Sequence, residues 1–374
     1  MKEAKQVKEP LIHLSKRSDI SKVKAWSIRI GAGLLALLVC AILTAGLTGH
    51  FFGFFTNIFK GSFGNLTRFE KLIKNTVILL GISVALGPAF KMKFWNIGAE
   101  GQVLVGALAT AACVHYFGGN LSNPVLILVM FVTSILAGAI WSVVPAVFKA
   151  FFGTNETLFT LMMNYIAMRL TGYFINRWVP DGSASMGNLS EGQLPSLFGS
   201  PYAINIILIL VITILIYLYM NYSKHGYELS VVGESLNTAK YVGINVKLVI
   251  IRTMLLSGIF CGVIGFLLVS GDQHTITTVL VNSRGFTAIL VAWLSQFNPI
   301  AMILTSFIVC FLEQAGSELV MVYDMGADAY SSILTGIFFL FIIGSTFFIN
   351  YKININKKVK KAPVVAQSIE KEDK

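Results

Sequence analysis

Polar side chains gather at two glycine-containing segments of an otherwise apolar chain. The first is Phe94–Gln102, where two glycines three residues apart stand beside amide and carboxyl side chains at the start of an apolar run. At membrane depth, polar groups and irregular backbone persist only where they are buried in protein or line a watery cavity. The segment therefore predicts either a helix cap near the membrane surface or a broken helix that faces a transport path.

The second segment is Asn282–Ala288, which opens a later and shorter apolar run. Five predicted membrane spans separate the openings of the two runs. Glycine-interrupted spans at matching places in two halves of a chain are typical of inverted-repeat transporters, whose substrate site lies between the repeats. We infer this symmetry from placement alone, because the residues of the two segments do not visibly repeat.

A third polar pattern is a stripe formed by Glu156, Thr160 and Asn164, which lie one helical turn apart. Such a stripe could line a transport path, or its side chains could bond neighbouring helices, as Asn and Thr do in membrane bundles.

Groups for catalysis or nucleotide binding are missing from the sequence. It has no P-loop pattern, and its five histidines form no metal-binding motif. The four cysteines are scattered through apolar segments, as expected for small buried side chains. We therefore expect no catalytic residue, no metal site and no cofactor bound by this chain.

The composition predicts an integral membrane protein. Of the 374 residues, 55% are hydrophobic and only 13% are charged, and the mean hydropathy is +0.73. A soluble domain carries about 25% charged residues. The net charge of +11 does not indicate nucleic-acid binding, because its cations are concentrated in the two terminal regions and no basic patch is interleaved with aromatic residues.

We expect an all-α protein with about ten transmembrane helices, arranged as a 5+5 inverted repeat with broken helices. A span needs about 20 apolar residues, and the eighth candidate is short. The predicted spans are Trp26–Leu47, Leu72–Phe90, Trp95–Phe117, Pro124–Phe148, Leu158–Trp178, Tyr202–Tyr222, Leu248–Ser270, Gly285–Phe297, Ile300–Met321 and Ser331–Tyr351.

The positive charges predict the orientation. Most of the 29 lysines and arginines fall on one side of these spans, which predicts that both termini are cytoplasmic. Residues 1–24 and 352–374 would be cytoplasmic tails around a transmembrane domain at 25–351. The polar connection 179–201 would then be external, and could be a lid, a docking surface or a plain loop.

The internal connection, residues 223–247, is the most informative soluble segment. Glycines ten residues apart bracket a stretch that could form a short amphipathic helix, with Leu236, Ala239 and Tyr241–Val242 on its apolar side. A separate subunit that drives transport could bind such a helix, or the helix could simply lie at the membrane surface.

Four segments, in order, resemble the permeases of ATP-binding cassette (ABC) importers for nucleosides and simple sugars, which are relatives of the branched-chain amino acid permeases. Phe94–Gln102 resembles the F-N-I-G-A-E-G-Q signature, and Thr154–Ala167 is similar to N-E-x-x-x-T-x-M-L-N-Y-I-A. Gly226–Val246 resembles the coupling loop, and Arg284–Pro299 is similar to the G-R-G-F segment that ends in N-P. The length and the full I-G-A-E-G-Q most resemble the larger permease of guanosine-type importers.

Three positions depart from the family pattern. Ser230 stands where an arginine is usual, Ser235–Leu236 where Asn-Pro is usual, and Trp293 where a small aliphatic residue is common. The first two departures put in doubt the detailed contacts to an ATPase.

The resemblance implies a multi-pass permease subunit of the bacterial cytoplasmic (inner) membrane. Its partners would be an ABC ATPase subunit that binds the ATP, a second homologous permease, an extracytoplasmic substrate-binding (lipo)protein and membrane lipid. The implied substrate-pathway residues are Asn96, Glu100, Gln102, Asn164 and Arg284. The implied ATPase-coupling residues are Gly226, Gly233, Glu234, Ala239 and Gly243.

An ion-gradient-driven secondary transporter is the alternative. In that case Glu100 or Glu156 could carry the proton, since carboxylates inside membranes often do so. A transporter of this kind would work without an ATPase.

Overall fold

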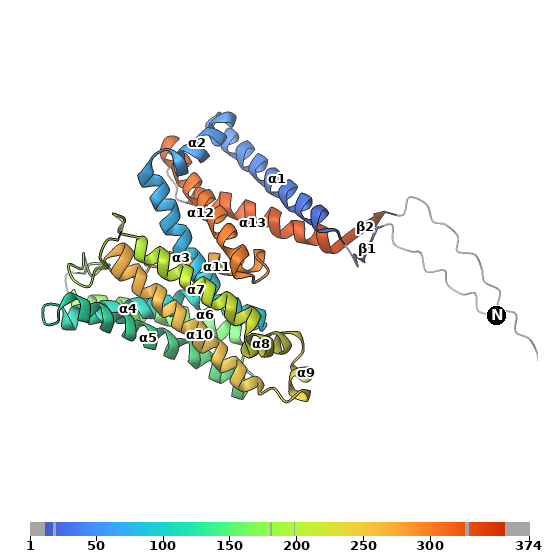
Figure 1. The fold of residues 1–374 in the computed structure, drawn as a ribbon. Coiled ribbons are helices and arrows are strands. Elements are labelled where there is room, and N and C mark those ends of the chain that lie inside the picture. The colour runs from blue at the N-terminus through green and yellow to red at the C-terminus, as the bar shows by residue number, and fades with distance from the viewer. Residues whose placement is uncertain (1–11, 18–19, 180–181, 198, 326–328, 356–374) are drawn as a thin grey trace, which may run out of the picture. The chain divides into compact units, whose positions relative to one another are not determined.

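The structure is a computed structural model that describes residues 12–17, 20–179, 182–197, 199–325 and 329–355 (Figure 1). Within these residues the chain is almost entirely helical. Of the predicted tails, residues 1–11, 18–19 and 356–374 lie outside the described part.

Every predicted span falls on a helix. In chain order the elements are β1 (Ile12–Lys16), α1 (Lys22–Thr48), α2 (Phe51–Phe63), α3 (Leu66–Lys91), α4 (Ala99–Phe117), α5 (Asn123–Phe152), α6 (Glu156–Trp178), α7 (Ala203–Tyr222), α8 (Lys224–Glu234), α9 (Leu236–Tyr241), α10 (Val246–Leu268), the π-helix η1 (Val269–Gln273), α11 (Arg284–Leu294), α12 (Pro299–Val322), α13 (Ala329–Asn350) and β2 (Tyr351–Ile355).

Seven helices in the described part are long and apolar enough to cross a membrane, namely α1, α3, α5, α7, α10 with its π-helical end, α12 and α13. The other three predicted spans correspond to α4 and α6, which carry more polar residues, and to the short α11. Ten spans therefore stay a prediction.

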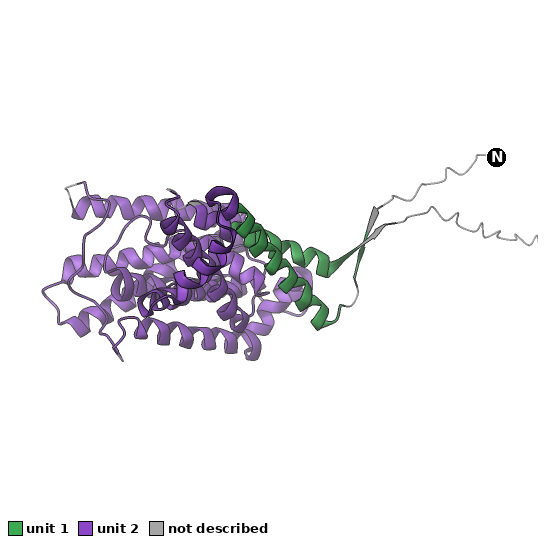
Figure 2. Ribbon diagram, turned by 90° about the horizontal axis from the view of Figure 1, so that it is seen from above, with its two compact units in different colours: residues 1–43, 336–374 green, residues 44–335 purple. Residues whose placement is uncertain are grey.

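The chain divides into two compact units, coloured green and purple in Figure 2. The first comprises residues 1–43 and 336–374, and the second comprises residues 44–335. In the first unit, β1 and β2 pair antiparallel, with Leu14 opposite Ile353. These strands lie in or beside the regions expected to be tails. The sequence does not predict them, because five residues among charged neighbours carry no clear strand pattern.

The second unit is built around α3 and α10. In their most apolar stretches, 83% of α3 and 78% of α10 is buried, against 28% of α5 and 33% of α7. All four cysteines are buried, as the sequence predicts. The two central helices therefore form the core, and helices such as α5 and α7 leave much of their apolar surface exposed.

Glycines let α10 approach α4 and α5 closely. A Cβ added to Gly262 would overlap the Ser134 carbonyl oxygen of α5, and one added to Gly265 would overlap the Val103 carbonyl oxygen of α4. Small residues at such spacings are the usual means of close helix packing in membranes. Backbone contact of this kind leaves no room for a side chain.

We expect Gly262→Leu to disrupt the packing of α10 against α5. Overpacking a tight site costs about 1–3 kcal/mol or more. The control is Gly46→Leu, because a Cβ at Gly46 on α1 meets no atom within 4 Å. Thermal unfolding of the detergent-solubilised protein should show a clear loss of stability for Gly262→Leu only. Equal unfolding temperatures for the two variants would contradict the close packing.

Candidate functional site

The two glycine-containing segments predicted from the sequence meet in the structure at Glu100. One carboxylate oxygen, Oε1, accepts a hydrogen bond from the Ser283 N–H at 2.9 Å, and Oε2 accepts one from the Gly285 N–H at 2.8 Å. Glu100 stands at the start of α4 and is only 8% exposed. The buried carboxylate therefore caps the N-terminus of α11 from a neighbouring helix.

The backbones of α4 and α11 touch at this point. A Cβ added to Gly285 would lie 2.6 Å from the Glu100 backbone nitrogen. Just before α11, Asn282 and Ser283 have positive φ angles of 53° and 59°. Such conformations are costly for residues other than glycine and persist where surrounding contacts fix them. The two hydrogen bonds to Glu100 supply such contacts.

Side chains from α6 hold the irregular backbone before α4. Asn164 accepts a hydrogen bond from the Gly101 N–H at 2.8 Å and donates one to the Ile97 carbonyl oxygen at 2.9 Å. The Thr160 hydroxyl accepts from the Ile97 N–H at 3.1 Å. Two members of the predicted polar stripe therefore bond a neighbouring segment. Its first member, Glu156, pairs with Lys149 at 2.6 Å.

Asn96 and Gln102 also lie in this buried junction. Asn96 is fully buried, and its Oδ1 accepts from the Gly98 N–H at 3.0 Å and from Gln102 Nε2 at 3.3 Å. Gln102 Oε1 is buried without a hydrogen-bond partner among the described residues. Four of the five predicted pathway residues thus come together at the start of α4.

Arg284, the fifth, lies on the other side of the junction. Its Nη2 donates to Asn75 Oδ1 of α3 at 2.8 Å, and its charge also attracts the Glu313 carboxylate of α12. The sequence does not single out Asn75, which lies at the edge of an apolar run; it indicates only a weak polar stripe around Glu313. Arg284 and Asn75 form a partly exposed polar cluster of α3 and α11.

The cluster lies at one end of a short helix. The 11 residues of α11 extend about 16 Å, roughly half of the 30 Å hydrocarbon core of a bilayer. At the other end of α11, Trp293 packs against Trp95, with ring centroids 5.2 Å apart. Trp293 therefore fills the space beside the segment that precedes α4.

The connection predicted to be external packs against the end of α10. The Leu194 N–H donates to the Ser270 carbonyl oxygen at 2.9 Å, and the Leu189 N–H donates to that of His274 at 2.7 Å. Glu191 accepts from the Gly119 N–H at 2.6 Å. These contacts make the described part of the connection, residues 182–197 and 199–201, an ordered cover over η1.

The predicted coupling segment forms two short helices, α8 and α9, separated at Ser235. Gly226 packs against the end of α7, and Gly233 against the end of α3, so closely that an added Cβ would overlap a carbonyl oxygen in each case. Gly243 has a φ angle of +83°, which glycine adopts most easily. Glu234 is exposed, at the end of α8.

The prediction that Leu236, Ala239 and Tyr241–Val242 share one apolar side of a helix is wrong in part. Ala239 is fully buried, but Leu236 is 53%, Tyr241 94% and Val242 60% exposed. The break at Ser235 leaves α9 only six residues long, which is too short to present one continuous apolar face.

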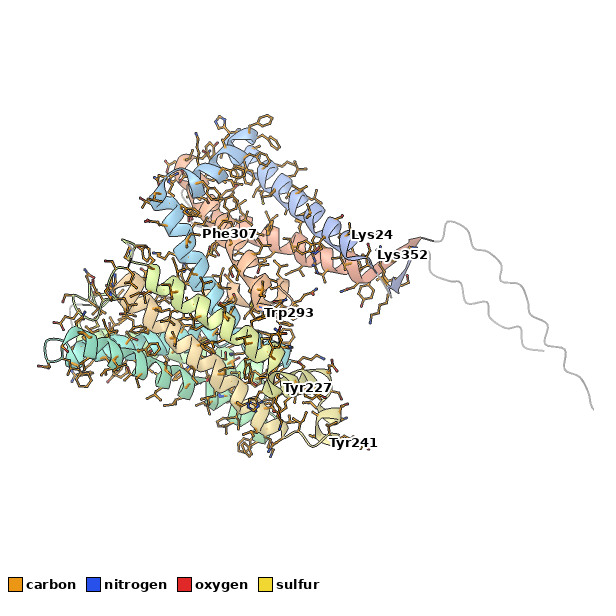
Figure 3. The ribbon with its side chains drawn as sticks, in the orientation of Figure 1. Lys24, Tyr227, Tyr241, Trp293, Phe307 and Lys352 are labelled. Carbon is orange, nitrogen blue, oxygen red and sulfur yellow. The ribbon has the colours of Figure 1, made fainter. Side chains whose placement is uncertain are left out.

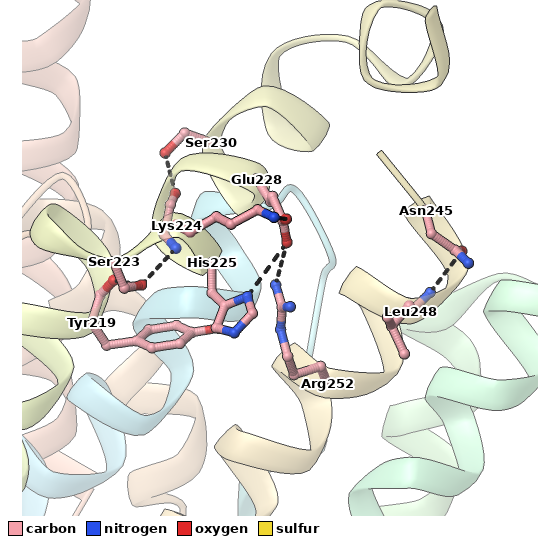
Figure 4. A network of polar contacts seen from close by, with 10 residues as sticks. Tyr219, Ser223, Lys224, His225, Glu228, Ser230, Asn245, Leu248 and Arg252 are labelled. Carbon is pink, nitrogen blue, oxygen red and sulfur yellow. Dashed lines mark hydrogen bonds and ion pairs between the residues drawn. The ribbon is translucent and has the colours of Figure 1, made fainter. Parts of the chain in front are cut away.

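An ion-pair network fixes α8 to α10 (Figure 4). Arg252 Nη2 donates to Glu228 Oε2 at 3.0 Å, and His225 Nδ1 lies 3.5 Å from the same oxygen. The hydrogen bond from Arg252 lowers the pKa of Glu228, so the pair stays charged at neutral pH. The sequence does not predict this pair, whose members are 24 residues apart.

The fold and the site define a polytopic membrane protein in which the irregular segments before α4 and α11 meet inside the core. A family model described as "Branched-chain amino acid transport system / permease component" matches residues 72–343. The chain belongs to this family of ABC transporter permeases, which are multi-pass inner-membrane transport subunits and not enzymes. The family resemblance noted in the sequence is thereby confirmed.

Curated relatives cover most of this chain. The guanosine ABC transporter permease protein NupP of Bacillus subtilis is 30% identical over 74% of this chain and 79% of its own length. The glucose ABC transporter permease protein TsgB13 of Haloferax volcanii is 27% identical over 75% and 76%. The nucleoside ABC transporter permease protein NupB of Lactococcus lactis subsp. cremoris is 22% identical over 69% and 75%.

We expect Glu100→Ala to destabilise the junction strongly. The Ser283 and Gly285 N–H groups would lose their acceptor, and each unsatisfied buried donor costs about 1–3 kcal/mol. Glu191→Ala is the control, because Glu191 also accepts a backbone N–H but at an exposed position. In mild detergent, the unfolding temperature should fall more for Glu100→Ala than for Glu191→Ala. Glu100→Gln should have an intermediate unfolding temperature, because its amide keeps one acceptor oxygen. Equal losses for Glu100→Ala and Glu191→Ala would contradict this role.

Proposed function

We propose that this chain is the transmembrane permease subunit of an ABC importer for nucleosides, with simple sugars as the second substrate class. The observation that carries the proposal is the junction at Glu100, where two broken helices meet in a chain of the ABC permease family. Relatives named as guanosine and nucleoside permeases support nucleosides, and one named as a glucose permease supports sugars.

The pathway residues divide into two roles in this proposal. Glu100 and Asn164 bond backbone groups at the starts of α4 and α11, and Asn96 bonds both a backbone N–H and neighbouring side chains. We therefore assign these three residues to holding the junction rather than to binding the substrate. Gln102 keeps one carbonyl oxygen without a partner in the described structure. Arg284, with Asn75, is the best candidate for contact with substrate hydroxyls, because these polar side chains are partly exposed.

We also propose the predicted topology of ten spans, arranged as a 5+5 inverted repeat with both termini cytoplasmic. The contact between the starts of α4 and α11 supports the repeat, since matching broken helices of inverted repeats meet at the substrate site. The antiparallel pairing of β1 with β2 supports the placement of both termini on one side.

Partners complete the proposed importer. An ABC ATPase subunit would supply ATP hydrolysis and dock on α8 and α9, from which Tyr227 and Tyr241 are exposed to solvent (Figure 3). A second homologous permease would complete the pathway. A substrate-binding (lipo)protein would deliver the ligand to the external connection, which would serve as its lid.

The alternative, an ion-gradient-driven transporter, is less well supported. Both carboxylate oxygens of Glu100 accept backbone N–H groups, an arrangement that favours the ionised carboxylate. A proton carrier at this position would have to break its own helix cap in each cycle.

Uptake measurements test the function. Cells without their own carriers should take up radiolabelled guanosine only when this chain is expressed together with its ATPase and the other partner subunits. A catalytically dead ATPase should abolish uptake, and Arg284→Gln should lower it severalfold without loss of the assembled complex. Uptake by the chain alone, collapsing with the proton gradient, would establish the secondary transporter instead. Adenosine and ribose in the same assay identify the substrate class.

Removal of the exposed apolar side chains of α9 should weaken ATPase docking. We expect the double variant Leu236→Ala, Tyr241→Ala to lower the affinity for the ATPase by at least about tenfold, because exposed aromatic residues often dominate binding energy. Affinity can be measured by co-purification and titration in detergent. Tyr173→Ala on α6 is the control, since Tyr173 is 64% exposed but lies outside the coupling segment. Equal binding by the two variants would exclude α9 as the docking surface.

A further inference from the structure

A basic cavity lies at the end of the second unit that carries α8 and α9. Its volume is about 550 Å³, and it is lined by the connection after α3 together with α5, the start of α6, α8, α9 and α10. The charged side chains of its lining are Lys93, Lys149, Glu156, Glu234, Lys240 and Lys247. Four lysines face two carboxylates, so the cavity has an excess of positive charge.

Three of these lysines are available to a ligand. Lys149 is paired with Glu156 at 2.6 Å. Among the described residues, no ion pair involves Lys93, Lys240 or Lys247. Lys247 Nζ lies 4.5 Å from the centroid of the Phe151 ring, which holds it at the cavity wall. A group with negative charge and several acceptor oxygens would suit this lining.

A separate apolar groove lies along α5. It has a volume of about 470 Å³, and its lining carries no polar surface. It runs from Leu136 to Phe148 and includes Leu255 of α10. The helical rise from Leu136 to Phe148 is about 18 Å, which is comparable with one half of a roughly 30 Å hydrocarbon core. Ile140 in this groove is 66% exposed, so the groove opens to the surroundings of the helix.

The groove and the cavity are adjacent on two helices. On α5, Phe148 lines the groove and the next residue, Lys149, lines the cavity. On α10, Leu255 lines the groove, and Ile250 and Lys247 line the cavity. The apolar groove therefore ends within one residue of the basic cavity on α5, which is the order of an acyl chain and its phosphate head group.

We propose that one anionic phospholipid, of the phosphatidylglycerol class, binds at this place. Its phosphate would lie among Lys93, Lys240 and Lys247, and an acyl chain would fill the groove along α5. Basic pockets between membrane helices bind anionic lipid head groups on the cytoplasmic side. Because Lys240 belongs to α9, the bound lipid would brace the proposed coupling helices against α5 and α10.

The groove favours a lipid over an acidic segment of a soluble partner. A polypeptide would leave its backbone polar groups unsatisfied along an apolar groove at membrane depth, which is strongly unfavourable. An acyl chain has no such groups.

Lipid titration of the complete, delipidated chain in mild detergent tests the proposal by native mass spectrometry. The probes are phosphatidylglycerol, phosphatidylcholine with the same acyl chains, and glycerol phosphate. We expect phosphatidylglycerol to bind at least about tenfold more tightly than either other probe, since each lysine near the head group contributes roughly a fivefold change in affinity.

Two variants locate the site. Lys93→Gln, Lys240→Gln, Lys247→Gln should remove the preference for phosphatidylglycerol. The control with the same change in charge is Lys60→Gln, Lys71→Gln, Lys224→Gln. These three lysines are exposed outside the cavity, so this variant should keep its preference for phosphatidylglycerol. Ile140→Trp, which fills the groove, should weaken phosphatidylglycerol binding severalfold while leaving all the lysines in place.

Three results would overturn the proposal. Equal binding of phosphatidylglycerol and phosphatidylcholine would exclude an anionic lipid site. Glycerol phosphate binding as tightly as phosphatidylglycerol would assign the cavity to a soluble phosphate. The variant that replaces Lys93, Lys240 and Lys247 could also keep its preference for phosphatidylglycerol but no longer co-purify with the ATPase. That result would show that these lysines bind the partner subunit instead of a lipid.

Discussion

The hydrogen bonds of the Glu100 carboxylate are the constraint on which the centre of the molecule depends. The start of a helix exposes unpaired N–H groups and carries positive partial charge. Two such ends, those of α4 and α11, touch here within a buried region. An anion between them stabilises their contact. Glu100 supplies that anion from α4 itself and accepts from Ser283 and Gly285 at 2.9 and 2.8 Å. The position of α11, and with it that of Arg284, follows from this contact.

The surrounding helices make the junction rigid. α3 and α10 are the most buried of the long apolar helices, and glycines on α10 bring its backbone against α4 and α5. Asn164 and Thr160 of α6 fix the irregular backbone before α4. With so many backbone groups satisfied, this region is poorly suited to large rearrangement. Any movement would therefore fall on elements with fewer such contacts, such as the exposed α9.

Much of the helical framework could be predicted from sequence, because each span is a local apolar run. The two broken segments were also predictable, since their polar and glycine residues conflict with the apolar runs that follow them. Their direct contact was not, because Glu100 and Gly285 are 185 residues apart. Asn75 and the pair of Glu228 with Arg252 were missed for the same reason. The aromatic helix α2 was missed because its 13 residues are too few for a span, and the short α9 did not form the single apolar face expected of it.

One helix connects the two ends of the proposed transport unit. Arg252, near the start of α10, holds Glu228 of α8 at 3.0 Å. At the far end of the same helix, the Ser270 carbonyl oxygen accepts the Leu194 N–H of the connection predicted to be external. The stretch Val246–Gln273 has 28 residues and is about 42 Å long. Because glycines along the middle of α10 bring its backbone against α4 and α5, a displacement of α10 would be passed to both of these helices. One tightly packed helix therefore carries the contact with α8 at one end and the contact with the predicted external connection at the other.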